Sequence, residues 1–166
     1  MPVTLRDATA EDQQFLLRVY ATTRAAELEL TPWTADQRHA FVQMQFEAQL
    51  RHYSSFYSAS IQQVILSDRE PVGRLYLNRT ADEIQILDVT VLPDHRGCGI
   101  GSAVIEGVLE EARLKGWNAR IYVDSGTPYV GFFERRGFCA MADDGVNTLM
   151  MWRTHDDSSR PVEPDA

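Results

Sequence analysis

The chain has 166 residues, of which 44% are hydrophobic, and its formal net charge is −8. This length is typical of one domain with a core that needs no disulfide or metal, and the hydrophobic content excludes a chain disordered throughout. An acidic chain is a poor partner for nucleic acid, because Lys and Arg contacts to phosphate supply most of that affinity. No apolar run approaches the ~20 residues that span a membrane, so we expect no membrane partner.

The two cysteines, Cys98 and Cys139, are far apart and give neither a zinc-ligand pattern nor a disulfide framework. The first residues lack the basic and apolar pattern of a secretory signal. We therefore expect no bound metal and a cytoplasmic location. Residues 155–166 hold four acidic side chains, two prolines and almost nothing apolar. We expect a disordered acidic tail there, behind a single domain at residues 1–154.

Apolar periodicity divides the first half of the chain into a strand, two helices and a set of strands. Residues 3–6 alternate as a short strand, and Thr9 can cap the helix that follows. Pro32 ends that helix, and Thr34 begins another with two apolar faces. Three strand-like runs with polar turns between them then predict an antiparallel meander. These runs are residues 61–66, 72–77 and 84–91.

The second half adds two helices, a strand and a final hairpin. Residues 102–115 form an amphipathic helix, and residues 119–123 a short strand. Thr127 and Pro128 suit the cap and first position of another helix. Residues 138–153 then predict a hairpin. The resulting order, βααβββαβαββ, predicts an α/β (α+β) domain around one mixed sheet.

A glycine-rich loop joins the third run of the meander to the next helix. Its sequence is Arg96-Gly97-Cys98-Gly99-Ile100-Gly101-Ser102. Glycines allow a positive φ and a close approach of a ligand to the backbone, while a helix start offers unpaired N–H groups and a positive dipole end. Because Arg96 adds a fixed positive charge, the segment suits a phosphate or pyrophosphate group.

Two common phosphate-binding loops do not fit this spacing. A Walker A loop needs Gly-Lys-Ser/Thr, and no lysine follows Gly99 or Gly101. The dinucleotide fingerprint needs G-x-G-x-x-G, but position 102 is serine. A nucleotide-binding regulatory domain is therefore disfavoured. A plain strand-to-helix turn is the simpler alternative, although three alternating glycines are entropically costly there.

Residues 96–101, together with the preceding Val91-Leu92-Pro93, resemble the acyl-CoA pyrophosphate loop of the GNAT superfamily. Residues 132–138, Phe-Phe-Glu-Arg-Arg-Gly-Phe, are similar to the second signature of that family, commonly Leu-Tyr-Glu-Lys-Leu-Gly-Phe. The two patterns lie about forty residues apart, in an element order that matches the family over roughly residues 3–153.

The resemblance implies a sheet of about seven strands, split in a V near Val91 and flanked by four helices. It implies acetyl-CoA as the acyl donor, with pantetheine along the strand and the pyrophosphate on the backbone N–H groups of residues 97–102. It also implies an N-acetyltransferase in which a primary amine of a small molecule or peptide attacks the thioester directly. A homodimer is common in the family. The implied cofactor-binding residues are Val89, Val91, Arg96, Gly97, Cys98, Gly99, Ile100, Gly101, Ser102 and Phe133.

Direct attack requires a base for the amine, an N–H donor for the oxyanion and a proton donor for the thiolate. Asp88 is the candidate base, with a structural aspartate on a half-exposed strand as the equal alternative. The N–H of Val91 or a neighbour is the candidate oxyanion donor. Phe133 stands where the family usually has tyrosine, so Tyr129, one turn earlier, becomes the candidate acid. A tyrosine packed on the core with a surface hydroxyl is the alternative.

In the family, the first two helices and the last hairpin shape the acceptor site. Glu27 and Trp33 are the candidate acceptor residues, since carboxylates there attract a cationic amine, although exposed helix faces commonly carry them as well. Arg135 and Arg136 are expected on a solvated helix face. Because Phe133 removes the usual proton donor, a non-catalytic acyl-CoA sensor is the alternative function.

Overall fold

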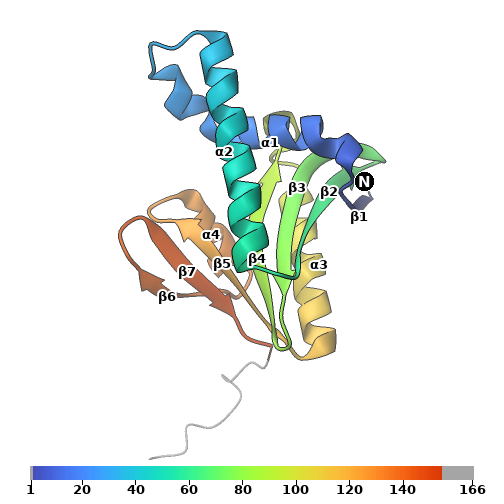
Figure 1. Cartoon of the computed structure of the whole chain (residues 1–166). Helices are drawn as coiled ribbons and strands as arrows, with labels where there is room; N and C mark the ends of the chain where they lie inside the picture. The colour runs from blue at the N-terminus through green and yellow to red at the C-terminus, as the bar shows by residue number, and fades with distance from the viewer. Residues whose placement is uncertain (1, 155–166) are drawn as a thin grey trace, which may run out of the picture.

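The computed structural model describes residues 2–154, so the expected tail lies outside the described residues. Within them, one mixed sheet of seven strands has the order β1-β2-β3-β4-β5-β7-β6 (Figure 1). The strands are β1 (Val3–Asp7), β2 (Ser60–Ser67), β3 (Glu70–Arg79), β4 (Glu83–Val91), β5 (Asn118–Asp124), β6 (Cys139–Asp143) and β7 (Asn147–Trp152). The helices are α1 (Gln13–Glu29), α2 (Ala35–Phe56), α3 (Ile100–Lys115) and α4 (Pro128–Glu134), with 3-10 turns at Ala10–Asp12 and Pro93–His95. This confirms the predicted order of elements.

Two apolar clusters hold the helices on opposite faces of the sheet. On one face, Val104, Ile105 and Leu109 of α3 pack with Leu75 of β3 and Ile84 of β4. On the other face, Leu16 and Tyr20 of α1 pack with Phe46 of α2 and Val64 of β2. The alternation of side chains along β2 supplies both layers, with Val64 in one cluster and Ile65 in the other, because neighbouring residues of a strand point to opposite faces.

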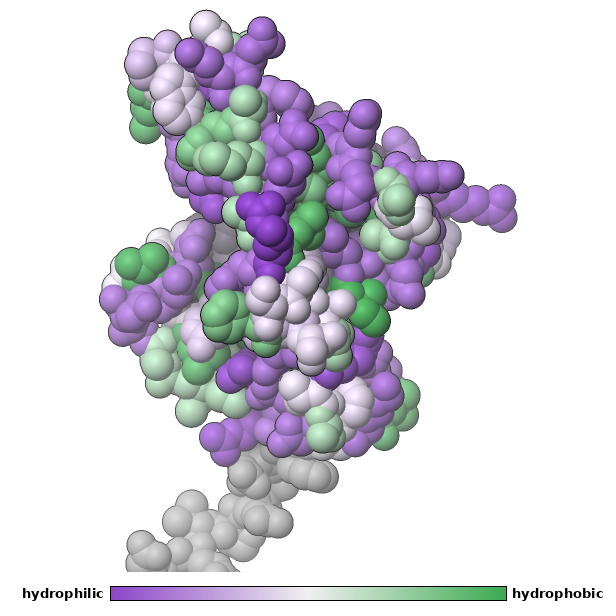
Figure 2. All heavy atoms as spheres, in the orientation of Figure 1, coloured by the Kyte–Doolittle hydropathy of each residue, from purple (hydrophilic) through white to green (hydrophobic). Residues whose placement is uncertain are grey.

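The α1–α2 hairpin extends well beyond the sheet, and its connecting loop forms the tip of the molecule (Figure 1). Thr34 caps α2 as predicted: its side chain accepts from the backbone N–H of Gln37 at 3.2 Å. Polar side chains dominate the surface of the face seen in Figure 2, with apolar side chains in separate patches.

An ion pair fixes the start of α1 to β1. Arg6 donates from both terminal nitrogens to the carboxylate of Asp12, at 2.8 and 2.9 Å, and the backbone N–H of Thr9 donates to the same carboxylate. The hydrogen bonds from Arg6, with that of Thr9, hold the pKa of Asp12 well below its usual value. Thr9 caps the 3-10 turn at Ala10–Asp12, and this turn separates it from the first residue of α1, Gln13.

The sheet opens between β4 and β5. These strands pair in parallel only from Glu83↔Asn118 to Ile86↔Ile121. Directly after this, the pairing of β4 with β3 shifts register, so that Leu87 has no partner on β3. A bulge of this kind bends a strand and increases its twist. The expected V-shaped split of the sheet is therefore present, but β4 and β5 separate at Leu87, four residues before the expected position near Val91.

Two helix starts differ in detail from the prediction. The third helix begins at Ile100, because Gly99 takes φ +85° and caps it, two residues before the predicted start. Thr127 precedes α4 as expected, but its hydroxyl donates to the carbonyl of Asp124 at 2.7 Å and makes no capping bond. No helix within residues 2–154 is long and apolar enough to cross a membrane.

Candidate active site

The glycine loop turns sharply where β4 ends and α3 begins. Gly97 and Gly99 have φ values of +79° and +85°, in the left-handed region that glycine tolerates best. A Cβ added at either position would meet no atom within 4 Å, so the backbone is open to a ligand on that side. The first N–H groups of α3 have no helical carbonyl to bond. An open backbone next to a helix N-terminus suits a pyrophosphate, so the loop fits acyl-CoA.

Arg96 and Cys98 hold the shape of this loop. Arg96 Nε donates to the carbonyl of Val91 at 2.8 Å and so ties the loop to the last residue of β4. The Sγ of Cys98 lies 2.9 Å from the carbonyl oxygen of His95 and therefore points back into the loop. Both side chains bond to carbonyls of the segment that leads into the loop, Val91 and His95, and so help to fix the conformation of the loop.

Arg136 lies at the start of α3, and this differs from the solvated position expected for it. Its Nη2 donates to the hydroxyl of Ser102, and its Nη1 donates to the carbonyl of Phe132 at 2.7 Å. The guanidinium also lies 3.6 Å from the centroid of the Phe132 ring. Arg135 is exposed, as expected. Arg136 thus places a positive charge next to the first turn of α3, where the sequence predicted only Arg96.

The two aromatic candidates on α4 lie in different environments. Phe133 is 3% exposed and packs edge-on against Phe132 and Phe138. Tyr129 is 56% exposed. Ile100, at the start of α3, is likewise buried, so its backbone rather than its side chain is available to a ligand. Phe133 therefore belongs to the apolar core that packs behind the site, while Tyr129 is open to solvent.

Asp88 lies one residue beyond the bulge, in a partly buried polar network. Arg74 of β3 donates from Nε and Nη2 to its Oδ2, at 2.9 and 2.6 Å. The Thr90 hydroxyl donates to the same carboxylate at 3.1 Å. Arg74 is 1% exposed and also donates to Gln49 of α2 at 2.8 Å. The network links the bulge in β4 to helix α2.

Tyr53 of α2 reaches the bulge itself. Its hydroxyl lies 3.4 Å from the carbonyl oxygen of Leu87, and its ring packs edge-on against Tyr76 with centroids 5.1 Å apart. Burial, with the negative charge of Asp88 nearby, raises the pKa of Tyr53 above its ordinary value. The phenol therefore stays protonated across the neutral range.

The sequence pattern does not single out Arg74, Gln49 or Tyr53. The available signal is Arg74 itself, a cation within the otherwise apolar run 72–77. A cation on the covered face of a strand requires a carboxylate nearby, and Asp88 on the adjacent strand is such a partner. The pairing depends on the register Tyr76↔Asp88, which the bulge sets and the sequence does not reveal.

Glu27 and Trp33 lie at the far end of the α1–α2 hairpin. Glu27 is exposed and pairs with Arg24 at 3.4 Å, and Trp33 is 38% exposed and packs in a tilted contact against Phe41. Twenty residues separate Trp33 from Tyr53, which is roughly 30 Å along a helix. The structure therefore does not bring these two residues together with Asp88.

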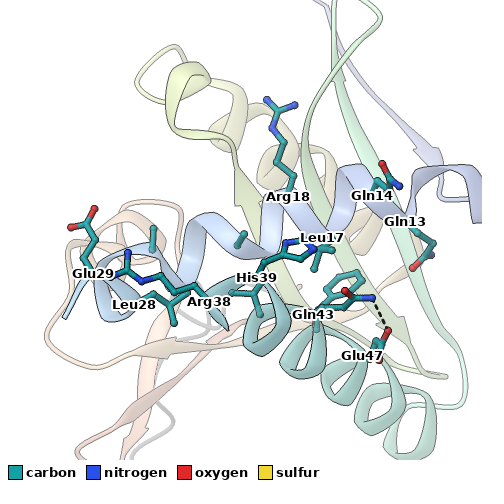
Figure 3. Close-up of a pocket in the computed structure, with 14 residues that line it drawn as sticks. Gln13, Gln14, Leu17, Arg18, Leu28, Glu29, Arg38, His39, Gln43 and Glu47 are labelled. Atoms are coloured by element: carbon teal, nitrogen blue, oxygen red, sulfur yellow. Dashed lines mark hydrogen bonds between the residues drawn. The ribbon is translucent and has the colours of Figure 1, made fainter. Parts of the chain in front are cut away.

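A groove of about 880 Å³ separates α1 from α2 (Figure 3). All its lining residues belong to these two helices, including Leu17, Arg38, His39 and Gln43. No residue of β4, the glycine loop or α4 lines it. The groove is thus separate from the opening of the sheet. No group of His, Cys, Asp and Glu suited to a metal ion occurs within residues 2–154.

Comparison with known proteins identifies the family. The sequence profile of the acetyltransferase (GNAT) family matches residues 22–138, and the chain belongs to this family. The protein is thus an acyltransferase of the acetyltransferase type. No curated protein sequence matches the chain.

Solved structures of N-acetyltransferases share the fold. PaiA N-acetyltransferase from Thermoplasma acidophilum, in complex with coenzyme A, has a TM-score of 0.69 at 17% identity, covering 92% of this chain and 99% of that one. A GNAT family acetyltransferase from Elizabethkingia anophelis with acetyl-CoA bound has a TM-score of 0.59 at 14% identity, with coverages of 91% and 97%. The ribosomal-protein-S18-alanine N-acetyltransferase from Escherichia coli has a TM-score of 0.62 at 16% identity, with coverages of 92% and 94%.

Proposed function

We propose that this chain transfers the acetyl group of acetyl-CoA to a primary amine of a small molecule or peptide. The observation that supports this best is the loop at the end of β4, where Gly97 and Gly99 open the backbone next to the start of α3. Two solved structures with this fold hold coenzyme A or acetyl-CoA, which supports the same role for this loop. Bound acetyl-CoA supplies the activated acyl group.

The residues of the chain divide into a binding set and a reacting set. The N–H groups of residues 97–102 bind the pyrophosphate, and the charges of Arg96 and Arg136 lie beside it. Beyond Ile86, β4 no longer pairs with β5, so the backbone groups near Val89 and Val91 on that side are available to pantetheine. An N–H of Val91 or a neighbour stabilises the oxyanion.

Asp88 is the proposed base. Its Oδ2 bonds to Arg74, which leaves Oδ1, shared with the Thr90 hydroxyl, to take a proton from the amine directly or through water. The amine nitrogen then bonds to the acyl carbon, the carbon–sulfur bond breaks, and the thiolate leaves with the bonding electron pair. Tyr129, exposed on α4, is the proposed proton donor to that thiolate.

Thiol release from acetyl-CoA with a panel of primary amines tests this function. An acetyltransferase releases coenzyme A thiol in proportion to the acetylated amine. The alternative, an acyl-CoA sensor without turnover, predicts coenzyme A binding with no thiol release from any amine. Full activity in Tyr129→Phe would remove Tyr129 as the acid and leave the rest of the proposal intact.

We further propose one domain over residues 1–154, since a single sheet runs from Val3 to Trp152. A cytoplasmic location and a homodimer remain part of this proposal. Light scattering of the purified chain measures the oligomeric state, and a mass of one chain would exclude the dimer.

A further inference from the structure

Three polar side chains form a stripe on α2, which we call the α2 polar stripe: Gln45, Gln49 and Tyr53. They are spaced four residues apart and so lie on one side of the helix. Gln49 accepts from Arg74, and Tyr53 reaches the carbonyl of Leu87. The stripe therefore lies against the sheet at the bulge, where a helix normally presents apolar residues.

Gln45 differs from the other two members. Its Oε1 is buried and has no hydrogen-bond partner among residues 2–154. A buried acceptor without a partner weakens a fold and is uncommon in native proteins. An unpaired oxygen next to a reaction site is explained if a ligand provides the missing donor.

The direction of α2 places Gln45 toward the glycine loop. Gln49 contacts Arg74, and Tyr53 contacts Tyr76, so α2 runs in the same direction as β3 and antiparallel to β4. Gln45, one turn before Gln49, therefore lies toward the end of β4 that leads into the loop. The α2 polar stripe thus follows β4 from the bulge toward Val91.

Gln45 does not itself line the groove between α1 and α2, although its neighbours Val42 and Phe46 do. Gln43 and Glu47 line that groove, and at 100° per residue Gln45 projects about 160° away from both. In Figure 1 the strands β5, β7 and β6 lie on the other side of α2 from β1 and β2, and Figure 2 shows the surface notched between α2 and these strands. A ligand that enters from this side meets the α2 polar stripe and the bulge together.

The Tyr53 hydroxyl can still accept a hydrogen bond. Its proton is directed to the Leu87 carbonyl, so a lone pair of the phenol oxygen is free to accept. Asp88, the proposed base, follows Leu87 directly in the chain. An amine that donates to Tyr53 would therefore lie within reach of Asp88.

We propose that Gln45 and Tyr53 form the acceptor subsite, in which Tyr53 receives the reacting amine at the bulge and Gln45 accepts a hydrogen bond from a second donor group of the acceptor. This inference rests on the proposed function. The two residues are eight apart, roughly 12 Å along the helix. The subsite therefore suits an acceptor with two donors several bonds apart, such as a diamine, an amino alcohol or the N-terminus of a peptide, over a simple alkylamine.

The test compares Gln45→Met and Tyr53→Phe with the matched controls Gln43→Met and Tyr57→Phe. Methionine keeps the length of glutamine and removes the unpaired oxygen, so Gln45→Met should keep or raise the melting temperature. Its KM should rise about 5- to 10-fold for a diamine or dipeptide and stay unchanged for a matched alkylamine. Tyr53→Phe should lower kcat/KM about 10-fold for both kinds of acceptor. Coenzyme A affinity should stay unchanged in all four variants.

Each outcome separates this inference from the proposed function. An active wild-type enzyme with unchanged KM values in Gln45→Met and unchanged kcat/KM in Tyr53→Phe overturns the subsite alone. An equal KM increase for alkylamine and diamine in Gln45→Met overturns the role assigned to the second donor. A wild-type chain that binds coenzyme A but releases no thiol with any amine overturns the proposed function and this inference with it.

Discussion

Arg74 directs two nitrogens to one oxygen of Asp88, with Nε at 2.9 Å and Nη2 at 2.6 Å from Oδ2. Arg74 is 1% exposed, whereas Asp88 is 24% exposed. A buried guanidinium depends on its counter-ion, because a buried charge without a partner is strongly unfavourable. Asp88 therefore neutralises Arg74 through Oδ2, while its Oδ1 accepts, within the described part of the chain, only from the Thr90 hydroxyl.

Asp88→Asn should lower both stability and turnover. We expect a loss of about 3 kcal/mol in the free energy of unfolding, because Arg74 stays buried without its carboxylate. Turnover should fall at least about 10-fold, most at low pH, where more of the amine is protonated. Chemical denaturation and thiol release at about pH 6–9 measure both effects.

The double variant Arg74→Met/Asp88→Asn is the control for that experiment. Removing the buried cation should restore most of the lost stability, since an ion pair can often be replaced by apolar groups at little cost. Turnover should not recover, because the base is still missing. Wild-type rates in either variant across the pH range would remove Asp88 from the mechanism.

Gly99→Ala should weaken coenzyme A binding. A side chain at φ +85° costs about 1–2 kcal/mol, and the new Cβ stands where the pyrophosphate approaches the loop. We expect the Kd for coenzyme A to rise at least about 10-fold in calorimetric titration. Gly107→Ala, within α3 and away from the loop, is the matched control and should gain about 0.5–1 kcal/mol of stability with unchanged affinity. Equal affinity in both variants would contradict the assigned position of the pyrophosphate.

Arg136→Leu should also weaken coenzyme A binding, by about 5- to 20-fold, with a weaker dependence on salt. Leucine is common at this position of the family signature, so the fold should tolerate it. The physical reason is the loss of the charge that Arg136 holds against Ser102 at the start of α3. Arg135→Leu, on the exposed side of the same segment, should bind as the wild type does. Indistinguishable titrations of the two variants would show that Arg136 has a structural role only.

Asp12→Asn should destabilise the protein in a pH-dependent way. Because Arg6 lowers the pKa of Asp12 in the folded state, the ion pair stabilises the fold fully above the ordinary pKa of aspartate. This contribution is lost progressively as the pH falls from that value through the lower pKa of the folded state. Arg6 is 42% exposed, so solvent screening limits the expected cost to about 1 kcal/mol at pH 7. Denaturation at about pH 7 and pH 2 measures it. A cost that is equal at both values would contradict the assignment.

The sequence predicts the order of elements because each helix and strand has its own apolar period and its own turn residues. The glycine loop is also predictable, since the spacing of Gly97, Gly99 and Gly101 is a local property of the chain. The structure confirms the fold class and places the loop at the end of β4, as expected. Local sequence is sufficient wherever neighbours in the chain determine the conformation.

Contacts between segments far apart in the chain are harder to predict from local sequence patterns. The split at Leu87 depends on a bulge in the register of β3 and β4, and a one-residue shift of register has no composition signal. Arg136 reads as an exposed helix residue in the sequence, yet it bonds to Ser102, 34 residues away. Tyr53 reaches Leu87 across the same separation. These pairings follow from the packing of α2 and α4 on the sheet, which no local pattern encodes.

Calorimetric titration of the purified chain with coenzyme A, in parallel with ATP and NAD, examines the central claim most directly. We expect saturable binding of coenzyme A, with affinities for ATP and NAD at least about 10-fold weaker, because the loop fits neither of their fingerprints. A chain with no measurable affinity for coenzyme A or its acyl forms would contradict the account.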